Sequence, residues 1–266
     1  MAMYLRQVCL VAQQLQPAIN ELTQVLGIEA CYVDPGVGKF GLENTLMAVG
    51  TNFLEVVAPV KESTAAGRFL AKRRGDAQDT QCGDGGYILV CQVDQKHHQQ
   101  ECRENAAALG VRVAYESSRD PYYLMQLHPA DLNNAMWEID WDRREELDGA
   151  WEPAGGIGWK EHVRRGTTVS LTGVELQCED PLSTATQWGT IAGIGVDSID
   201  GGYRLVLENA ELRFVADRDG RGSGLAGVDL TVRDIQVVID AAAAFNSRRD
   251  GDCVELCGTR FYLSDS

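Results

Sequence analysis

Two glutamates stand inside strand-like apolar runs of this sequence. Glu55 lies in the run 53–57, and Glu138 lies in the run 137–141. A carboxylate in so apolar a segment must face water, a partner or a metal ion, because burying an unpaired charge is costly. Such a carboxylate can ligate a divalent ion or move a proton next to a carbonyl group. Glu55 and Glu138 are therefore the candidate catalytic residues.

Three further residues are candidates for contacting a ligand. Asn44 begins a strand-like run and could donate a hydrogen bond to a substrate carbonyl; the alternative is an ordinary strand residue. Tyr87 follows a glycine-rich loop that lacks the Lys-Ser/Thr ending of a phosphate-binding loop, and it either closes the site or packs in the core. His128 precedes Pro129 at a strand end, where it either touches a ligand or holds a turn.

The elements that must position these residues form a repeat. A strand is followed by a helix with Pro17 in its first turn and Gly27 at its end, and three more strands come next. The β-run at Tyr87 begins 83 positions after the one at Tyr4 and leads into the same order of elements. The expected strands are 4–12, 30–33, 40–49, 52–57, 87–93, 111–116, 122–127 and 134–141, and the expected helices are 17–26, 65–72 and 97–109.

Two weaker copies follow a linker at about residues 142–166. The expected strands are 168–178, two within 203–215, 225–232 and a hairpin at 253–263, and the expected helices are 182–193 and 234–245. Ser183 and Asp234 are the predicted N-caps of these helices. Because each helix is followed by strands joined by short turns, the pattern favours an α+β fold over a parallel doubly wound sheet.

Several runs resemble the vicinal-oxygen-chelate superfamily, which includes glyoxalase-like and antibiotic-sequestering proteins. Residues 5–11 resemble the opening strand of its module, and residues 53–59 and 211–215 resemble its closing strand. The run 127–140 is similar to the end of methylmalonyl-CoA epimerase and its relatives. The resemblance implies tandem βαβββ modules, four in two pairs, that form cup-shaped mixed sheets. The expected domains are residues 1–142 and a degenerate second pair at 160–266.

The resemblance also implies a metal site in the first pair of modules. The corresponding ligand positions are Gln7, Glu55, Ile88 and Glu138, with 48 positions between the first two and 50 between the last two. Isoleucine replaces the histidine of the family, so a divalent metal (Zn, Ni, Mn, Co or Fe) would have Gln7, Glu55 and Glu138 as its protein ligands. In the second pair the corresponding positions are taken by Val174, Val228, Arg213 and either Phe261 or Tyr262, which predicts no metal there.

Composition excludes several functions. A net charge of −15 repels phosphate backbones and anionic lipid, so neither nucleic acid nor membrane is an expected partner. No apolar run approaches a membrane span and no cleavable signal pattern opens the chain, which favours a cytoplasmic protein. The eight cysteines include no CxxC pair and are expected to be free thiols.

Three functions are compatible with these patterns. The first is a lyase or isomerase that acts on a small oxygenated metabolite, with a glutamate as base and with or without a metal. The second is a metal-free protein that binds or sequesters a small molecule, in which Trp137, Trp141 or Tyr87 stacks on a cationic ligand. The third, an extradiol dioxygenase, needs two histidines and a glutamate in the second pair, where apolar residues stand. The second pair is expected either to support the fold or to form half of an interface, and a homodimer is a further expectation.

Overall fold

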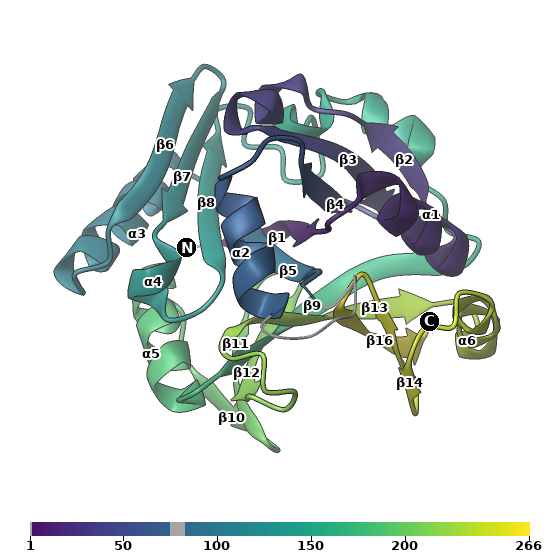
Figure 1. Ribbon diagram of the computed structural model, residues 1–266. Helices are drawn as coiled ribbons and strands as arrows, with labels where there is room; N and C mark the ends of the chain where they lie inside the picture. Colours follow the sequence, from purple (N-terminus) through teal and green to yellow (C-terminus); the bar gives the residue numbers. More distant parts are fainter. Residues whose placement is uncertain (1, 75–82) are drawn as a thin grey trace. The chain divides into compact units, whose positions relative to one another are not determined.

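The computed structural model describes residues 2–74 and 83–266, and the strands of this part form two mixed sheets of eight (Figure 1). The strand order of the first sheet is β2-β3-β4-β1-β5-β8-β7-β6, and that of the second is β10-β11-β12-β9-β13-β16-β15-β14. Each sheet holds two βαβββ modules, so the predicted α+β class and the predicted four modules are confirmed. Most of the predicted connector loop, residues 75–82, lies outside the described residues.

The first sheet carries modules one and two. Module one comprises β1 (Met3–Val11), α1 (Leu15–Leu26), β2 (Glu29–Tyr32), the 3-10 helix η1 (Pro35–Phe40), β3 (Leu42–Val49) and β4 (Asn52–Pro59). Helix α2 (Ala65–Arg74) follows. Module two comprises β5 (Gly85–Val93), α3 (Lys96–Ala108), β6 (Val113–Arg119), β7 (Tyr122–Leu127), α4 (Pro129–Leu132) and β8 (Met136–Asp142).

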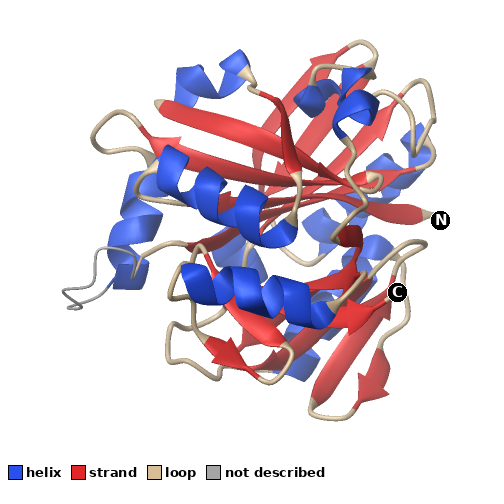
Figure 2. Cartoon of the chain, turned by 90° about the vertical axis from the view of Figure 1, so that its right-hand side faces the viewer, coloured by secondary structure: helices blue, strands red, loops and turns tan. Residues whose placement is uncertain are grey.

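The second sheet carries modules three and four, after a linker with the 3-10 helices η2 (Glu152–Ala154) and η3 (Gly158–His162). Module three comprises β9 (Thr168–Cys178), α5 (Pro181–Ala192), β10 (Asp197–Ile199), β11 (Gly202–Val206) and β12 (Glu211–Ala216). Module four comprises β13 (Gly224–Val232), α6 (Ile235–Ala244), β14 (Arg249–Asp250), β15 (Cys253–Leu256) and β16 (Thr259–Asp265). Figure 2 shows long helices lying against faces of the strands.

Local chemistry explains most element boundaries. Helix α1 ends at Gly27, which has the left-handed φ of 62° that the sequence predicts. Asp234 caps α6 as predicted, but the N-cap of α5 is Asp180 rather than Ser183, because the Asp180 carboxylate accepts the Ser183 amide at 3.0 Å. Three short elements, β10, β14 and α4, were not predicted, since two to four residues carry no periodic pattern.

The chain divides into two compact units that each combine modules of different sheets. The first unit is Met1–Gln7, Tyr87–Gly149 and Gly173–Ala226, and the second is Val8–Gly86, Ala150–Thr172 and Gly227–Ser266. Most of modules two and three therefore lies in the first unit, and most of modules one and four lies in the second, while β1 and β9 are divided between the two. The predicted boundary between 142 and 160 separates the strands of the two sheets, and its status as a domain boundary stays a prediction.

Aromatic stacking joins modules two and three within the first unit. The rings of Trp137 on β8 and Trp188 on α5 are stacked with centroids 4.3 Å apart, and Phe214 on β12 meets Trp188 edge-on at 5.7 Å. All three side chains are fully buried. This core holds β8 in place from the side opposite to its carboxylates, since neighbouring residues of a strand point to opposite faces.

The linker packs against module one within the second unit. Trp151 stacks on Phe53 of β4 at 6.4 Å between centroids, and Trp159 meets the same ring edge-on at 5.2 Å. Both tryptophans are buried, so the linker is a folded part of the unit. Because Phe53 and Glu55 are two residues apart on β4, the linker covers the face of module one that carries Glu55.

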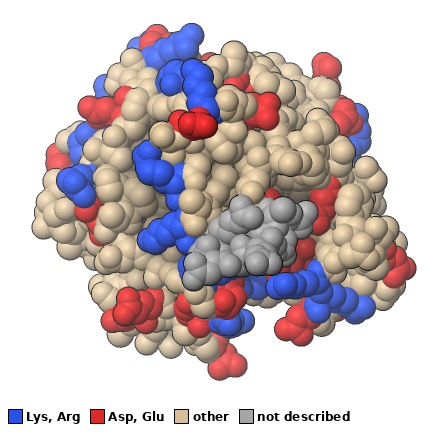
Figure 3. All heavy atoms as spheres, viewed as in Figure 1, with Lys and Arg blue, Asp and Glu red and all other residues tan. Residues whose placement is uncertain are grey.

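Seven of the eight cysteines lie in the described part of the chain, and all seven are free thiols, as predicted. Cys82 lies outside it. Within the described residues, no helix is long and apolar enough to cross a membrane. On the face shown in Figure 3, acidic and basic side chains lie in small groups separated by uncharged surface.

Candidate functional site

Strand β8 presents a row of buried carboxylates on one face. Glu138, Asp140 and Asp142 alternate with Trp137, Ile139 and Trp141, so the acids share the face opposite to the apolar residues. Glu138 is 5% exposed and Asp140 is 0% exposed. Sequence reasoning identified Glu138 but missed Asp140, although their spacing of two residues in a predicted strand was the signal that could have found it.

Strand β7 supplies the hydrogen-bond partners of these acids. Gln126 stands opposite Glu138 in the antiparallel register, and its Nε2 donates to Glu138 Oε2 at 2.5 Å. The hydroxyl of Tyr122 lies 3.4 Å from Glu138 Oε1 and also hydrogen-bonds Asp140 Oδ2. We call Gln126, Tyr122, Glu138 and Asp140 the β8 cluster. Its carboxylates are held in fixed positions, as a proton-transfer site requires.

The surroundings of Asp140 and Tyr122 favour their protonated forms. Burial, together with the charge of Glu138, raises the pKa of Asp140 well above its ordinary value. Burial also raises the pKa of Tyr122, with further contributions from Asp140 and Glu138. Two buried carboxyl groups this close cannot both be ionised at low cost, so they share a proton over a wide pH range.

A buried arginine accompanies the cluster. Arg6 on β1 is 1% exposed, and burial lowers its pKa to about 10, against the opposing charges of Tyr122, Asp148 and Asp142. The guanidinium therefore stays charged at neutral pH. Asp142 is bonded by a second arginine, since Arg144 Nη2 lies 2.6 Å from its Oδ2. Sequence reasoning missed Arg6, because the ligand position that the resemblance implies is the next residue, Gln7.

The predicted metal position Gln7 is buried, at 5% exposure, on β1. Because side chains alternate along a strand, Gln7 points to the face of β1 opposite to Arg6, whose charge interacts with Tyr122 and Asp142. Its role as a ligand stays a prediction.

Ile88, which replaces the histidine of the family, lies on β5, the strand that pairs with β8. In the parallel register Val90 stands opposite Glu138, and Ile88 stands opposite Met136. The two predicted ligand positions of module two, Ile88 and Glu138, are therefore displaced by two residues along the paired strands. Gln92 stands opposite Asp140 and is fully buried. Within the described part of the chain, neither polar atom of the Gln92 amide has a hydrogen-bond partner, and the same holds for Asp140 Oδ1.

Glu55 and Asn44 come together in module one. Asn44 Nδ2 donates to Glu55 Oε1 at 2.5 Å, and Asn44 Oδ1 accepts the amide of Asp34 at 3.0 Å. Asn44 therefore uses its side chain to hold a neighbouring carboxylate and the start of η1. With the linker tryptophans on the same face, this pair resembles a packed structural contact more than an open site.

Tyr87 and His128 occupy other surroundings. Tyr87 shares a face of β5 with Leu89, which stands opposite Trp137, so Tyr87 points away from the face that carries Glu138. The Nδ1 of His128 accepts the amide of Ala130 at 3.2 Å and caps α4. The structural turn that the sequence allowed for His128 is the arrangement observed, and the ligand-binding roles of both residues stay predictions.

The capping geometry of His128 carries a testable prediction. Replacing His128 with alanine is expected to lower the free energy of unfolding by about 1 kcal/mol, because the N-terminal amides of α4 lose their acceptor. His128→Asn, which restores a capping acceptor, is expected to recover most of this loss in a urea titration. A ligand-contacting role would instead be indicated if both variants kept their stability and lost ligand binding.

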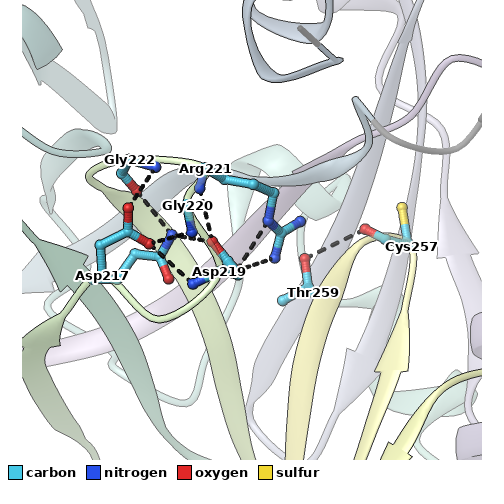
Figure 4. A network of polar contacts seen from close by, with 8 residues as sticks. Asp217, Asp219, Gly220, Arg221, Gly222, Cys257 and Thr259 are labelled. Atoms are coloured by element: carbon cyan, nitrogen blue, oxygen red, sulfur yellow. Dashed lines mark hydrogen bonds and ion pairs between the residues drawn. The ribbon is translucent and has the colours of Figure 1, made fainter. Parts of the chain in front are cut away.

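The loop after β12, residues 217–222, is stabilised by hydrogen bonds and an ion pair between its own residues. Asp217 accepts the amides of Asp219, Gly220 and Gly222, at 3.0 to 3.1 Å (Figure 4). Asp219 in turn pairs with the guanidinium of Arg221 at 2.7 Å. The positive charge that neutralises Asp219 therefore comes from Arg221, and the loop is a closed structural turn.

The metal position that the resemblance implies lacks its nitrogen ligand, because Ile88 cannot ligate. In the described part of the chain, no three or more His, Cys, Asp or Glu side chains gather as metal ligands do. Glu55 Oε1 and Glu138 Oε2 each accept a side-chain amide. This donor set does not fit a divalent ion, and no chemical step is derived through one.

Comparison with known proteins places the fold. No protein-family model and no curated protein matches the sequence. A hypothetical protein from Staphylococcus aureus is similar over 100% of both chains, with a TM-score of 0.62 and 11% identity. A triple mutant of 4-hydroxymandelate synthase from Streptomyces coelicolor is similar over 94% of this chain and 78% of that one, with a TM-score of 0.67 and 13% identity.

A methylmalonyl-CoA epimerase from Mycobacterium tuberculosis is similar over 52% of this chain and 87% of its own, with a TM-score of 0.43 and 24% identity. The two matches that span nearly the whole chain carry the structural conclusion. The predicted fold of paired βαβββ modules is confirmed, and the chain shares this fold with these two proteins. At these identities the likeness establishes the fold and not the activity.

Proposed function

We propose that this protein is a proton-transfer enzyme of the isomerase or lyase type that acts on a small carbonyl-containing metabolite, with Glu138 as its base. The observation that carries the proposal is the β8 cluster: a carboxylate that is 5% exposed, fixed by Gln126 and Tyr122, beside a second buried acid. A carboxylate held in a fixed position is what abstraction of a proton next to a carbonyl requires.

The test is exchange of carbon-bound hydrogen with solvent. Purified protein is incubated in D₂O with acetoacetate, glyceraldehyde or an acyl thioester of N-acetylcysteamine, and loss of the proton next to the carbonyl is followed by ¹H NMR. Exchange above the protein-free rate with at least one of these compounds supports the proposal. Exchange at the protein-free rate with all three, and with longer acyl thioesters, contradicts it.

The metal-dependent version of the activity makes a separate prediction. Because the donor set does not fit a divalent ion, adding Zn²⁺, Ni²⁺ or Mn²⁺ to chelator-treated protein is expected to leave its melting temperature unchanged. Binding of an ion at 100 times its Kd would stabilise the fold by about 2.7 kcal/mol, which a thermal-shift assay resolves easily. A stabilisation that disappears in Glu138→Gln would show that the cluster rearranges into a metal site.

A metal-free binding protein is the second candidate, and Ile88 at the family's histidine position favours it. The positions of Trp137 and Trp141 change the expected contacts of a cationic ligand. Trp137 and Trp141 lie on the face of β8 opposite to the acids, and Lys96 Nζ already lies 5.6 Å from the Trp141 ring centroid. A cationic ligand near the acids would therefore not stack on these two tryptophans. Saturable binding of such a ligand without any hydrogen exchange would favour this candidate.

A further inference from the structure

We propose that Tyr122 is a second catalytic group of this site, acting as an acid toward the substrate oxygen while Asp140 resupplies its proton. This inference rests on the proposed role of Glu138 as the base. Neither Tyr122 nor Asp140 is distinguished by the sequence motifs, and both reach the site through the pairing of β7 with β8.

The hydrogen bonds define a direction. The Tyr122 hydroxyl has one proton and contacts two carboxyl groups, Glu138 Oε1 at 3.4 Å and Asp140 Oδ2. It therefore donates to one acid and accepts from the other, and the acid that donates must be protonated. Asp140 is fully buried, whereas Glu138 keeps some exposure, so Asp140 is the acid that holds the proton. The hydrogen-bonded relay therefore runs from Asp140 to Tyr122 to Glu138.

The relay ends at Asp140, the more deeply buried of its two acids. Asp140 Oδ1 and both polar atoms of Gln92 have no hydrogen-bond partner within the described part of the chain, so no protein group there extends the relay inward. Asp140 also hydrogen-bonds the Glu138 side chain directly, so within the described part of the chain its proton moves to and from Tyr122 and Glu138. Asp140 and Tyr122 therefore act as a store that gives up one proton and takes it back.

The charged groups around this store come from four segments. Arg6 on β1 interacts electrostatically with Tyr122, and Asp142 on β8 and Asp148 place negative charges near Arg6. Cys91 on β5 is a buried thiol whose pKa is raised to about 12, mainly by burial and partly by the charge of Asp140. The relay therefore lies beside one buried cation, Arg6, which also faces two carboxylates.

The proposed step is balanced without a metal or a redox partner. Glu138 removes the proton next to the carbonyl, and the C–H electron pair becomes a C=C bond. The carbonyl π pair moves to oxygen, which takes the Tyr122 proton, while the Tyr122 oxygen takes the Asp140 proton. The products of this step are a neutral enol, a neutral Glu138 and an Asp140 carboxylate. Reversing these transfers restores the substrate, and its C–H bond then carries solvent hydrogen if the Glu138 proton has exchanged with water.

Two measurements on the full-length protein test this relay. The Tyr122 proton, held between two acids, is expected to give a ¹H NMR signal downfield of the backbone amides. Tyr122→Phe should remove the signal and lower hydrogen exchange about 100-fold, within the range for loss of one acid–base group. Asp140→Asn, which can still donate to Tyr122 but has no proton to transfer, should keep the signal and lose the exchange.

The matched control is Tyr123→Phe, because Tyr123 is the next residue of β7 and stands opposite Trp141 on the other face. It should keep both the signal and the exchange rate. Exchange at the wild-type rate in a folded Tyr122→Phe, or a downfield signal that survives this change, overturns the relay. If Glu138→Gln alone abolishes exchange, the proposed function stands without the relay; if Glu138→Gln leaves exchange intact, the proposed function fails.

Discussion

Replacing Glu138 with glutamine is expected to lower protein-catalysed hydrogen exchange about 100- to 10,000-fold, the usual contribution of a positioned base. Glutamine has nearly the shape of glutamate and can still meet the Gln126 amide and the Tyr122 hydroxyl, but it cannot take a proton. The melting temperature should stay close to that of the wild type, because no volume is lost from the face of β8.

Glu179→Gln is the matched control for this variant. Glu179 lies in the same compact unit but is exposed just after β9, so its substitution should leave exchange unchanged. Full activity in Glu138→Gln would remove Glu138 from the mechanism. A large drop in both variants would point to a charge effect of the whole surface instead.

Replacing Arg213 with alanine is expected to lower the free energy of unfolding by about 3 kcal/mol, because it takes the guanidinium away from a buried acid. Arg213 Nη1 lies 3.2 Å from Glu175 Oε2, and Glu175 is fully buried on β9. The register places Arg213 directly opposite Glu175. The sequence placed Arg213 at a ligand position of the degenerate second pair, and the structure pairs it with the buried Glu175.

Substituting both partners separates the cost of the unpaired charge from the loss of contacts. Glu175→Leu combined with Arg213→Met should recover most of the stability in a denaturant titration, since apolar side chains of similar volume replace buried pairs at little cost. If Arg213→Ala were as stable as the wild type, Glu175 would have to be neutral or otherwise paired in the folded chain.

The repeated order of elements was predictable because each βαβββ module leaves periodic signals. The 3.6-residue pattern of α1, the glycine at its end and the alternating strands all lie within short windows of sequence. The position of Glu138 followed from the same pattern. Elements of two to four residues, such as β10, β14 and α4, leave no such signal, and η1 takes in Phe40, the first residue of a predicted strand.

The partners of Glu138 could not be predicted, because they depend on strand register. Gln126 and Tyr122 reach Glu138 through the β7–β8 pairing, and Gln92 meets Asp140 through the β5–β8 pairing. A register shifted by one residue would turn these side chains to the other face. The linker, which reads as a simple connector, covers the face of β4 beside Glu55 through Trp151 and Trp159, a tertiary contact with no local signature.

The central claim is that Glu138 and not Glu55 is the catalytic carboxylate, and hydrogen exchange measured side by side in Glu138→Gln and Glu55→Gln tests it most directly. Glu55 is tied to Asn44 at 2.5 Å on a face that the linker covers, whereas Glu138 lies in the β8 cluster. If Glu138 is the base, exchange is expected at the protein-free rate in Glu138→Gln and near the wild-type rate in Glu55→Gln. Loss of exchange in Glu55→Gln with full exchange in Glu138→Gln would contradict it.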